Sequence, residues 1–495
     1  MSHAQNLADH TLSAAIRNGK MNRRAWIVTS MLVLFQIVNF ADKAVLGLVA
    51  DPAMRELGLT AGQFGFIGSA FFFLFAIVGV AVGFLAGKVS TRWILLTMGV
   101  AWAVLQFPML FGGGAAVLLV TRILLGGAEG PATPISLQHV HGWFKPKERG
   151  LPSSIVAAGS TLGPILAAPA LAWIIANPAL GWRWAFGFLG LFGLLWSVAW
   201  LIVGRDGPYS HSKAGKALAQ EESEAAQRTS PHSVTNHEAQ SEPVEEFEPN
   251  GTGSIADSAD LLQIVPIRRV LGSWMFVAAV LAGAGCFWAQ GFLTTWSPKY
   301  LGSVVALSPE MIGLVSTFPW VVGAIALLIL GFGSRYLMKR GVTVRWALGA
   351  LFGATLLVSG LCFSILPFLS GYAAVAMLTL GAGTAMIYPL APTAIAFSVC
   401  SKQRAAIMAT LTGLASIGGV IAPAMVGGLM DRAGYVPGAK GVADTAEMSA
   451  LLAQGMNSSF GMIGIYLVIV GVFCVLMLNP DRTARRLQTK FTFTG

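Results

Sequence analysis

Apolar residues in this chain gather in long uninterrupted runs rather than in the short alternating patterns of a soluble protein. A hydrocarbon core about 30 Å thick takes roughly 20 apolar residues per helix. Runs of that length occur at 26–49, 62–86, 93–112, 116–140, 152–175, 184–203, 270–296, 309–331, 343–366, 371–397, 405–429 and 458–478. The pattern predicts an all-α membrane protein with twelve transmembrane helices, arranged as six, a polar gap and six more.

Polar segments flank and separate these runs and predict five regions. They are an N-terminal tail at 1–25, a six-helix half at 26–203, a linker at 204–269, a second half at 270–478 and a C-terminal tail at 479–495. Residues 204–262 hold eleven acidic residues among Ser, Gln, Asn and Pro. Such a stretch cannot bury enough apolar surface to fold, so we expect disorder. The basic first tail precedes a true spanning helix and is not expected to be a signal peptide.

Charge and cysteine usage narrow the class of protein. Only 11% of the residues are charged, against roughly 25% in a soluble domain. Of the 32 Lys and Arg residues, 25 lie in the tails and even-numbered loops, 5 in odd-numbered loops and 2 inside helices. Cytoplasmic loops carry this excess, so both termini and the linker are expected on the cytoplasmic side of the cell (inner) membrane. The net charge of +10 is then a topology signal and indicates no nucleic-acid partner. The four cysteines lie in or beside apolar runs and are expected to be packing residues, not disulfides or metal ligands.

Short matches between the two halves indicate an internal duplication. Lys147-Glu148-Arg149 precedes the fifth run and Lys402-Gln403-Arg404 precedes the eleventh. Fourteen residues after each arginine lies a glycine, Gly163 or Gly418. Parallel repeats of this kind are typical of transporters with a central site, so we expect two six-helix halves around a central cavity.

Four ionisable residues lie within the predicted helices: Asp42, Lys43, Arg122 and Glu129. A charge at bilayer depth costs at least about 2.5–3.5 kcal/mol, so their gathering in two helices indicates function. Arg122 and Glu129 are two turns apart, on nearly one face and about 10 Å apart along the axis. If the first and fourth helices face each other, Asp42 can pair with Arg122. A carboxylate beside a cation suits proton coupling, because an anionic substrate competes for the same cation. The alternative is that the charges only hold the two helices together.

Several segments carry a resemblance to a known family. They are NFADK at 39–43, RILLGGAEGP at 122–131, WF at 143–144 with KERG at 147–150, GWRWAF at 181–186 and WSPKYL at 296–301. On these segments the chain resembles the major facilitator superfamily and, within it, the anion:cation symporter family of sugar-acid, carboxylate and phthalate carriers. The resemblance implies uptake of a small organic anion with protons by alternating access, driven by the proton gradient without a cofactor. It also implies protonation at Asp42 and Glu129, a gate partner in Arg122 and an anion contact in Lys43.

The sequence departs from the family pattern at positions that bear on the substrate. Lys43 stands where the family usually has Arg, and Lys88 follows Gly87 where the superfamily usually has an Asp. Ser160 in the fifth helix and Ser416 in the eleventh replace a common Gln and Asn. Polar groups there would hold the hydroxyls of a sugar acid, so their absence favours an aromatic or short apolar carboxylate.

Other side chains have weaker claims to a role. Candidates for substrate contact, besides the cations, are Ser160, Trp288, Gln290, Trp296, Tyr388 and Ser416. The glycines Gly79, Gly83, Gly87, Gly159 and Gly163 are expected to allow close helix packing. His139 and His141 are expected to be solvated rather than a proton relay, and Arg482, Arg485 and Arg486 to contact anionic lipid.

Rival functions remain open at this point. The leading prediction is a monomeric proton-coupled symporter of an organic anion. An efflux antiporter for drugs or metabolites is disfavoured by the cations of the first half, and a membrane sensor without transport has no named partner. An enzyme is not expected, because the chain lacks HExxH and Walker patterns and a His, Cys and Asp cluster outside the bilayer.

Overall fold

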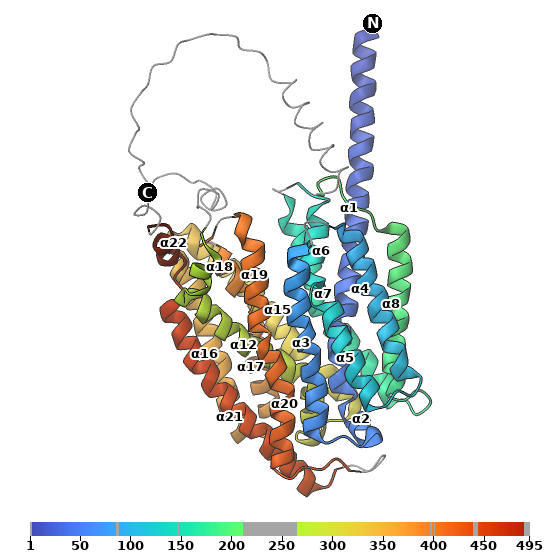
Figure 1. Cartoon of the computed structure of the whole chain (residues 1–495), viewed down its shortest axis with the longest axis vertical. Coiled ribbons are helices and arrows are strands. Elements are labelled where there is room, and N and C mark those ends of the chain that lie inside the picture. The colour runs from blue at the N-terminus through green and yellow to red at the C-terminus, as the bar shows by residue number, and fades with distance from the viewer. Residues whose placement is uncertain are drawn as a thin grey trace.

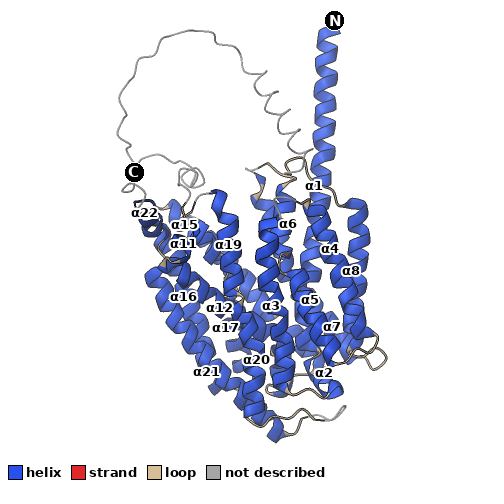
Figure 2. Ribbon diagram, in the orientation of Figure 1, coloured by secondary structure: helices blue, strands red, loops and turns tan. Residues whose placement is uncertain are grey.

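The protein is built from helices that run between two polar ends. The computed structural model describes residues 2–85, 89–145, 148–210, 265–396, 398–399, 401–438 and 444–489. Within these ranges there is no strand, and twelve helices are long and apolar enough to cross a membrane (Figures 1 and 2). The predicted all-α membrane fold is therefore confirmed.

The N-terminal half supplies six of these spans. Its helices are α1 (Ser2–Leu48), α2 (Ala50–Leu57), α3 (Ala61–Leu85), α4 (Thr91–Leu110), α5 (Ala115–Glu129), α6 (Ala132–His141), α7 (Gly150–Ala176) and α8 (Arg183–Val203). α5 and α6 together form one span, and α2 is a short helix that follows α1 at the end remote from the start of the chain (Figure 1). Within this half α1 packs on α7, α3 on α5 and α4 on α8.

The C-terminal half supplies the other six. Its helices are α11 (Ile267–Leu271), α12 (Trp274–Thr295), α13 (Ser297–Ser303), α14 (Pro309–Val315), α15 (Phe318–Lys339), the π-helix η2 (Arg345–Ala350), α16 (Leu351–Ile365), the 3-10 helix η3 (Leu366–Phe368), α17 (Gly371–Ala385), α18 (Leu390–Ala396), α19 (Ser401–Ala415), α20 (Ile417–Arg432), α21 (Ala446–Met477) and α22 (Pro480–Thr489). α12 packs on α20, and α16 on α17 and α21. The two halves stand side by side and touch through α3 with α20 and α7 with α14 (Figure 1).

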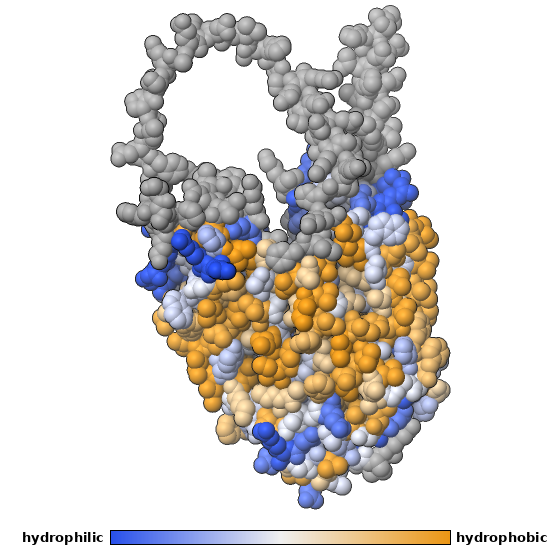
Figure 3. All heavy atoms as spheres, viewed as in Figure 1, coloured by the Kyte–Doolittle hydropathy of each residue, from blue (hydrophilic) through white to orange (hydrophobic). Residues whose placement is uncertain are grey.

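On the face shown in Figure 3, a broad apolar belt crosses the bundle between its polar ends. Large apolar side chains in this belt point outward; examples are Phe73, Val104, Leu195, Ile329 and Ile469. A soluble monomer rarely exposes a continuous apolar surface of this extent, whereas hydrocarbon is its natural solvent and helices satisfy their own backbone groups there. The chain is a multi-pass membrane protein.

The expected spans agree with the observed ones to within a few residues at most ends. The largest difference is the last span, which was predicted at 458–478 and runs from Ala446 to Met477. The first turns of this helix contain polar residues, so they do not form part of an apolar run. The Thr445 hydroxyl caps the helix by accepting a hydrogen bond from the backbone N–H of Met448. The polar turns of this helix extend beyond the apolar run at its start.

The predicted linker is described only at its ends, and residues 211–264 lie outside the described part of the chain. At its start, the backbone N–H of Tyr209 donates to the carbonyl of Gly142 at 2.8 Å. At its end, the backbone N–H of Val265 donates to the Gln403 side chain at 3.0 Å, just before α11. Each end is thus attached to its own half.

Glycines allow helices within the N-terminal half to approach closely. A Cβ atom on Gly126 of α5 would lie 1.8 Å from the carbonyl oxygen of Phe71, and one on Gly163 of α7 would lie 2.7 Å from that of Ile37. Gly159 is equally close to α1, and Gly79 lies against Gly130. The expected packing role is confirmed for Gly79, Gly159 and Gly163, while Gly83 and Gly87 fall outside the described side chains.

Candidate functional site

The four charges within the N-terminal helices form two ion pairs between α1 and α5. Lys43 Nζ lies 2.5 Å from Glu129 Oε2. Arg122 Nη1 lies 3.8 Å from Asp42 Oδ1 and donates to the Asp42 carbonyl oxygen at 3.4 Å. All four side chains are buried. The predicted pairing of Asp42 with Arg122 is confirmed, and the Lys43–Glu129 pair is a contact that the sequence did not predict.

We call Asp42, Lys43, Arg122 and Glu129 the charged cluster, and two neutral amides extend it. The Gln106 side chain of α4 donates to Asp42 Oδ1, and Lys43 Nζ donates to Asn39 Oδ1 at 2.7 Å. The sequence analysis did not predict a role for Gln106. An amide within the apolar run 93–112 nevertheless indicates a buried polar partner, because burying it without one is costly. The cluster therefore joins α1, α4 and α5.

Hydrogen-bonding capacity is left over at the centre of the cluster. Among the described residues, no hydrogen-bond partner is found for the donors Asn39 Nδ2 and Arg122 Nη2, whereas the Asp42 and Glu129 carboxyl groups lie within hydrogen-bonding reach of each other. Buried polar atoms are nearly always paired, because leaving one without a partner costs about 1–3 kcal/mol. The two spare donors can hold an anion, and the two neighbouring carboxyl groups can take up a proton.

With all four side chains ionised, the cluster carries two positive and two negative charges and is neutral. Asp42 acts electrostatically on Glu129, and both carboxylates act on Arg122. An added anion would leave a buried net charge of minus one. Such a charge costs several kcal/mol unless a cation or a proton accompanies it.

Helix packing explains why Arg122 and Glu129 face α1. Gly126 and Gly130 press against the backbone of α3, where a Cβ atom on Gly130 would lie 2.3 Å from the Phe75 carbonyl oxygen. α5 ends at Glu129, and α6 begins after Pro131, which cannot donate a backbone hydrogen bond. The small residues thus fix α5 on α3, and the charged pair two turns apart occupies the face toward α1.

Aromatic rings surround the ammonium group of Lys43. Its Nζ lies 4.3 Å from the ring centroid of Phe40, 5.7 Å from that of Phe71 and 5.8 Å from that of Phe75. Rings at this range stabilise a cation. Two further ring contacts cross between the halves here, Phe75 with Phe287 at 6.4 Å and Phe40 with Trp320 at 6.2 Å.

The aromatic candidates of the C-terminal half divide into two groups. Trp296 is fully buried and donates to the Pro423 carbonyl oxygen at 2.9 Å. Trp288 is also buried and packs on Phe292 within its own half. Tyr388 is only half-buried and contacts the Phe287 ring at 5.1 Å, which connects it to the rings near Lys43. Among the described residues, Tyr388 is the aromatic candidate of this half that ring contacts link to the charged cluster, through Phe287 and Phe75.

The two serine candidates bond to their own helices, and within the described part of the chain no hydrogen bond is found for the Gln290 side chain. Ser160 Oγ donates to the Ala157 carbonyl oxygen at 2.6 Å, and Ser416 Oγ to that of Gly413 at 2.8 Å. Gln290 is half-buried, and its carbonyl oxygen accepts from Thr294. Neither serine hydroxyl reaches the charged cluster in this conformation.

The expectation that His139 is solvated is wrong. Its ring is buried, lies 2.8 Å from the Thr91 hydroxyl and packs edge-on against Trp200 at 5.1 Å. His141 is half-buried and lies 2.8 Å from Ser153 Oγ. Both rings pack α6 against neighbouring helices. The end of this span at His139 and His141 is therefore more buried than its position next to a loop predicts.

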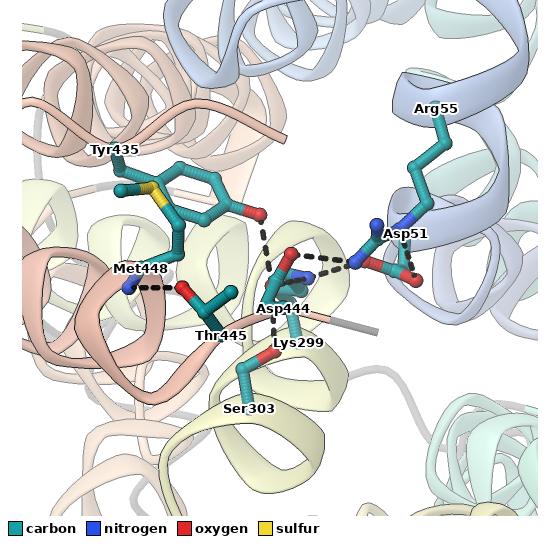
Figure 4. Close-up of polar contacts among 8 residues, drawn as sticks. All are labelled: Asp51, Arg55, Lys299, Ser303, Tyr435, Asp444, Thr445 and Met448. Atoms are coloured by element: carbon teal, nitrogen blue, oxygen red, sulfur yellow. Dashed lines mark hydrogen bonds and ion pairs between the residues drawn. The ribbon is translucent and has the colours of Figure 1, made fainter. Parts of the chain in front are cut away.

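A second charged network joins the two halves at the end of the bundle remote from the start of α1 and from α22 (Figures 1 and 4). Lys299 of α13 pairs with Asp51 of α2 and, at 2.7 Å, with Asp444. Arg55 of α2 lies 2.6 Å from Asp444 and 2.9 Å from Asp51. We call Asp51, Arg55, Lys299 and Asp444 the outer network. The Tyr435 hydroxyl adds a hydrogen bond to Asp444 at 3.2 Å.

The outer network is largely shielded from water. The side chains of Arg55, Lys299 and Asp444 are buried, and Asp51 is the most exposed of the four. Burial would by itself raise the pKa of Asp444, but Lys299, Arg55 and the Tyr435 hydroxyl outweigh it and hold this pKa below its usual value. A second contact between the halves lies nearby, where Asp431 accepts from the Thr60 hydroxyl at 2.8 Å. This end of the bundle is held closed.

Two surface clefts lie away from the charged cluster. One, of about 450 Å³, is lined by Thr343, Arg345, Trp346, Asn479, Arg482, Arg485 and Arg486. The other, of about 510 Å³, lies beside α3 and includes Asp431. The first brings together the arginines that the sequence assigned to lipid contact, and neither includes a member of the cluster around Lys43. Among the described residues, no group of His, Cys, Asp and Glu is arranged to hold a metal ion.

Known proteins similar to this chain are membrane transporters. A family model described as Major Facilitator Superfamily matches residues 32–423. A hexuronate transporter of Bacillus subtilis (strain 168) is 26% identical over 86% of this chain and 93% of its own length. A probable galactarate/D-glucarate transporter of Escherichia coli (strain K12) is 25% identical over 93% of this chain and 96% of its own length.

Solved structures share the fold. A bacterial homologue of the human lysosomal transporter Spinster, in an inward-facing and unoccupied conformation, superposes with a TM-score of 0.68 at 19% identity, covering 94% of this chain and 98% of that one. A D-xylose–proton symporter gives a TM-score of 0.63 at 14% identity, covering 92% and 98%. At these identities the likeness supports the fold alone.

Proposed function

The chain belongs to the Major Facilitator Superfamily, and from that premise we propose that it is a proton-coupled symporter that takes up a small organic anion by alternating access. The substrate would carry a carboxylate, the energy source would be the proton gradient, and no cofactor would be needed. The distribution of Lys and Arg favours an orientation with both termini in the cytoplasm. The relatives named above are sugar-acid transporters, which supports an anionic substrate.

The observation that carries the proposal is the neutral buried cluster with spare donors. A carboxylate substrate would take the free Nη2 of Arg122 and compete with Glu129 for Lys43. Glu129 would then lose its ion pair in a buried setting, where the neutral acid is the cheaper form. One proton per substrate charge would keep the cluster neutral, so binding of anion and proton would favour each other.

The outer network supplies the second requirement, a barrier that can open. In this conformation charged pairs across the halves close one end of the bundle (Figure 4). Alternating access requires the halves to part at this end and close at the other. Because the network is itself neutral and its ions can be hydrated when separated, it can serve as a reversible closure.

An efflux antiporter is the second candidate, and the cluster disfavours it. Lys43 and Arg122 present two buried cations with a free guanidinium nitrogen, which suits an anion better than an organic cation. A purely structural role for the pairs would leave no use for the donors Asn39 Nδ2 and Arg122 Nη2, which have no partner among the described residues. Anion symport accounts for both features.

Glu129→Gln tests the proposal. In proteoliposomes with an inward pH gradient, the variant should lose accumulation of labelled benzoate or glucuronate, whichever the wild-type protein concentrates, while exchange across equal concentrations survives. Glu310→Gln is the matched control, since Glu310 is exposed and lies outside the cluster. Concentrative uptake at the wild-type level in Glu129→Gln would contradict proton coupling at this site.

A further inference from the structure

The surroundings of Lys43 point to the chemical class of the substrate. Three phenylalanine rings from α1 and α3 lie within 6 Å of its ammonium group, at 4.3, 5.7 and 5.8 Å. A carboxylate that reaches Lys43 Nζ therefore places the rest of its molecule against these rings. The ring surface is apolar and offers a hydroxyl group no hydrogen bond.

The rings continue into the opposite half. Phe75 contacts Phe287 of α12 at 6.4 Å, and Phe287 contacts Tyr388 at 5.1 Å, in each case at a steep angle. These edge-to-face contacts are the arrangement that aromatic rings prefer with one another. A flat aromatic substrate between the halves could replace one ring contact with another as the halves move.

Three hydroxyl groups that could bind a sugar acid are already used. The Tyr388 hydroxyl donates to Thr412 Oγ1 at 3.1 Å. Ser160 and Ser416, at positions where polar side chains would hold a sugar acid, bond to carbonyl oxygens of their own helices. The hydroxyls of a polyhydroxylated acid would lose their water against the phenylalanine rings and find no free partner in these three hydroxyl groups, which penalises its binding.

We infer that the substrate is an aromatic monocarboxylate, whose carboxylate binds Lys43 and Arg122 while its ring packs among Phe40, Phe71, Phe75 and Phe287. The inference rests on the proposed anion transport and sharpens it. It separates this chain from the sugar-acid transporters to which it is similar. The two cations would bind the carboxylate, and the rings would make the site prefer an aromatic acid to a polyhydroxylated one.

Binding to the purified full-length protein tests the inference. Benzoate and phenylacetate are compared with gluconate and glucuronate by calorimetry, so that every probe carries a single negative charge. The aromatic acids should bind at least about tenfold tighter, the size of effect expected for well-packed ring contacts. Phe75→Ala and Phe287→Ala should each reduce this preference severalfold.

Phe73→Ala is the matched control, because Phe73 lies on α3 two residues from Phe75 and is exposed in the apolar belt. The ratio of the two affinities is the readout, and it does not depend on the fraction of protein that folds. Equal or tighter binding of the sugar acids by the wild-type protein would overturn the inference and leave anion transport intact. An unchanged ratio in Phe75→Ala and Phe287→Ala would also overturn it. If neither class of acid binds, the proposed function itself fails, and the inference with it.

Discussion

Replacing Lys299 with methionine should open the end of the bundle that the outer network closes. Lys299 pairs with Asp51 of the other half and with Asp444 of its own half, and its side chain is almost fully buried. Methionine keeps most of the length and the apolar stem but removes the charge. Asp51 then loses its pair across the halves, and Asp444 keeps Arg55 as its partner.

The size of the effect follows from what each carboxylate retains. Removing one partner of a buried ion pair costs about 3–5 kcal/mol when the remaining charge has no other partner. Arg55 still contacts both carboxylates, and Asp51 is substantially exposed to water, so we take roughly 2 kcal/mol, about half of that cost. At 1.4 kcal/mol per factor of ten, the closed arrangement should lose a factor of about 30 relative to the open one.

Thiol labelling measures this equilibrium. Thr295 is buried in α12 and packs against Gly68 of the opposite half, so a cysteine there becomes reachable only when the halves part. Thr295→Cys is placed in a background without the four native cysteines, and a membrane-impermeant maleimide is added from outside the cell. When opening and closing are fast, the labelling rate follows the open population, and Lys299→Met should raise it by about 30-fold at most.

Arg183→Met is the control, because the Arg183–Glu56 pair at 2.9 Å lies within one half at the same end of the bundle. It should lower thermal stability without changing the labelling rate. A labelling rate for Lys299→Met equal to that of the wild type, in protein that is correctly inserted, would refute a closing role for the outer network.

Three further predictions concern the charges and the linker. Lys43→Ala and Arg122→Ala should each lose at least about tenfold in anion uptake, since removing a charge-assisted bond costs about 1.5–3 kcal/mol; full uptake in both would exclude them as anion contacts. The lowered pKa of Asp444 means that its stabilising charge is present above the usual carboxyl pKa and lost only as the pH falls through the lowered value. Asp444 should therefore cause no change in the labelling rate of Thr295→Cys between about pH 5 and pH 8. A steep rise of this rate near pH 6 that disappears when Asp444→Asn is added would contradict this. Deleting residues 215–245 should leave uptake intact, because each end of the linker is hydrogen-bonded to its own half; loss of uptake in normally inserted protein would show an active role.

Hydropathy sufficed for the fold because membrane spans are set by a single length, the thickness of the hydrocarbon core. It failed where a helix extends beyond its apolar part, as in the polar first turns of α21. It also could not place the interruption of the fourth span after Glu129, where α5 ends and α6 begins. The break lies at Gly130 and Pro131, which a search for apolar runs passes over because the run continues on both sides.

The charged cluster can be predicted from the sequence more readily than the outer network. Asp42, Lys43, Arg122 and Glu129 stand out because a charge is rare inside an apolar run. The outer network is made of residues at helix ends and in a loop, where charges are ordinary. Its partners are also far apart in the chain, 248 residues for Lys299 with Asp51 and 389 for Arg55 with Asp444. Only the arrangement of the halves brings them together.

One continuous segment connects the charged cluster to the outer network. α1 carries Lys43 and ends at Leu48, and α2 begins at Ala50 and carries Asp51 and Arg55. Helical hydrogen bonds continue across the junction, since the backbone N–H of Val49 donates to the Val45 carbonyl at 3.0 Å. If a substrate carboxylate draws Lys43 away from Glu129, as proposed, α1 will lose an attachment to α5 within its own half.

The same segment is held to the other half just below Lys43. A Cβ atom on Gly47 would lie 2.8 Å from the Thr294 carbonyl oxygen, so α1 and α12 touch through their backbones there. A shift of α1 must therefore either carry α12 with it or break the contacts of α2 with Lys299 and Asp444. Both consequences act on the closure between the halves. The α1–α2 segment would therefore couple occupancy of the cluster to opening of the outer end. Under the proposed mechanism, this segment would move when the cluster is kept neutral by a proton.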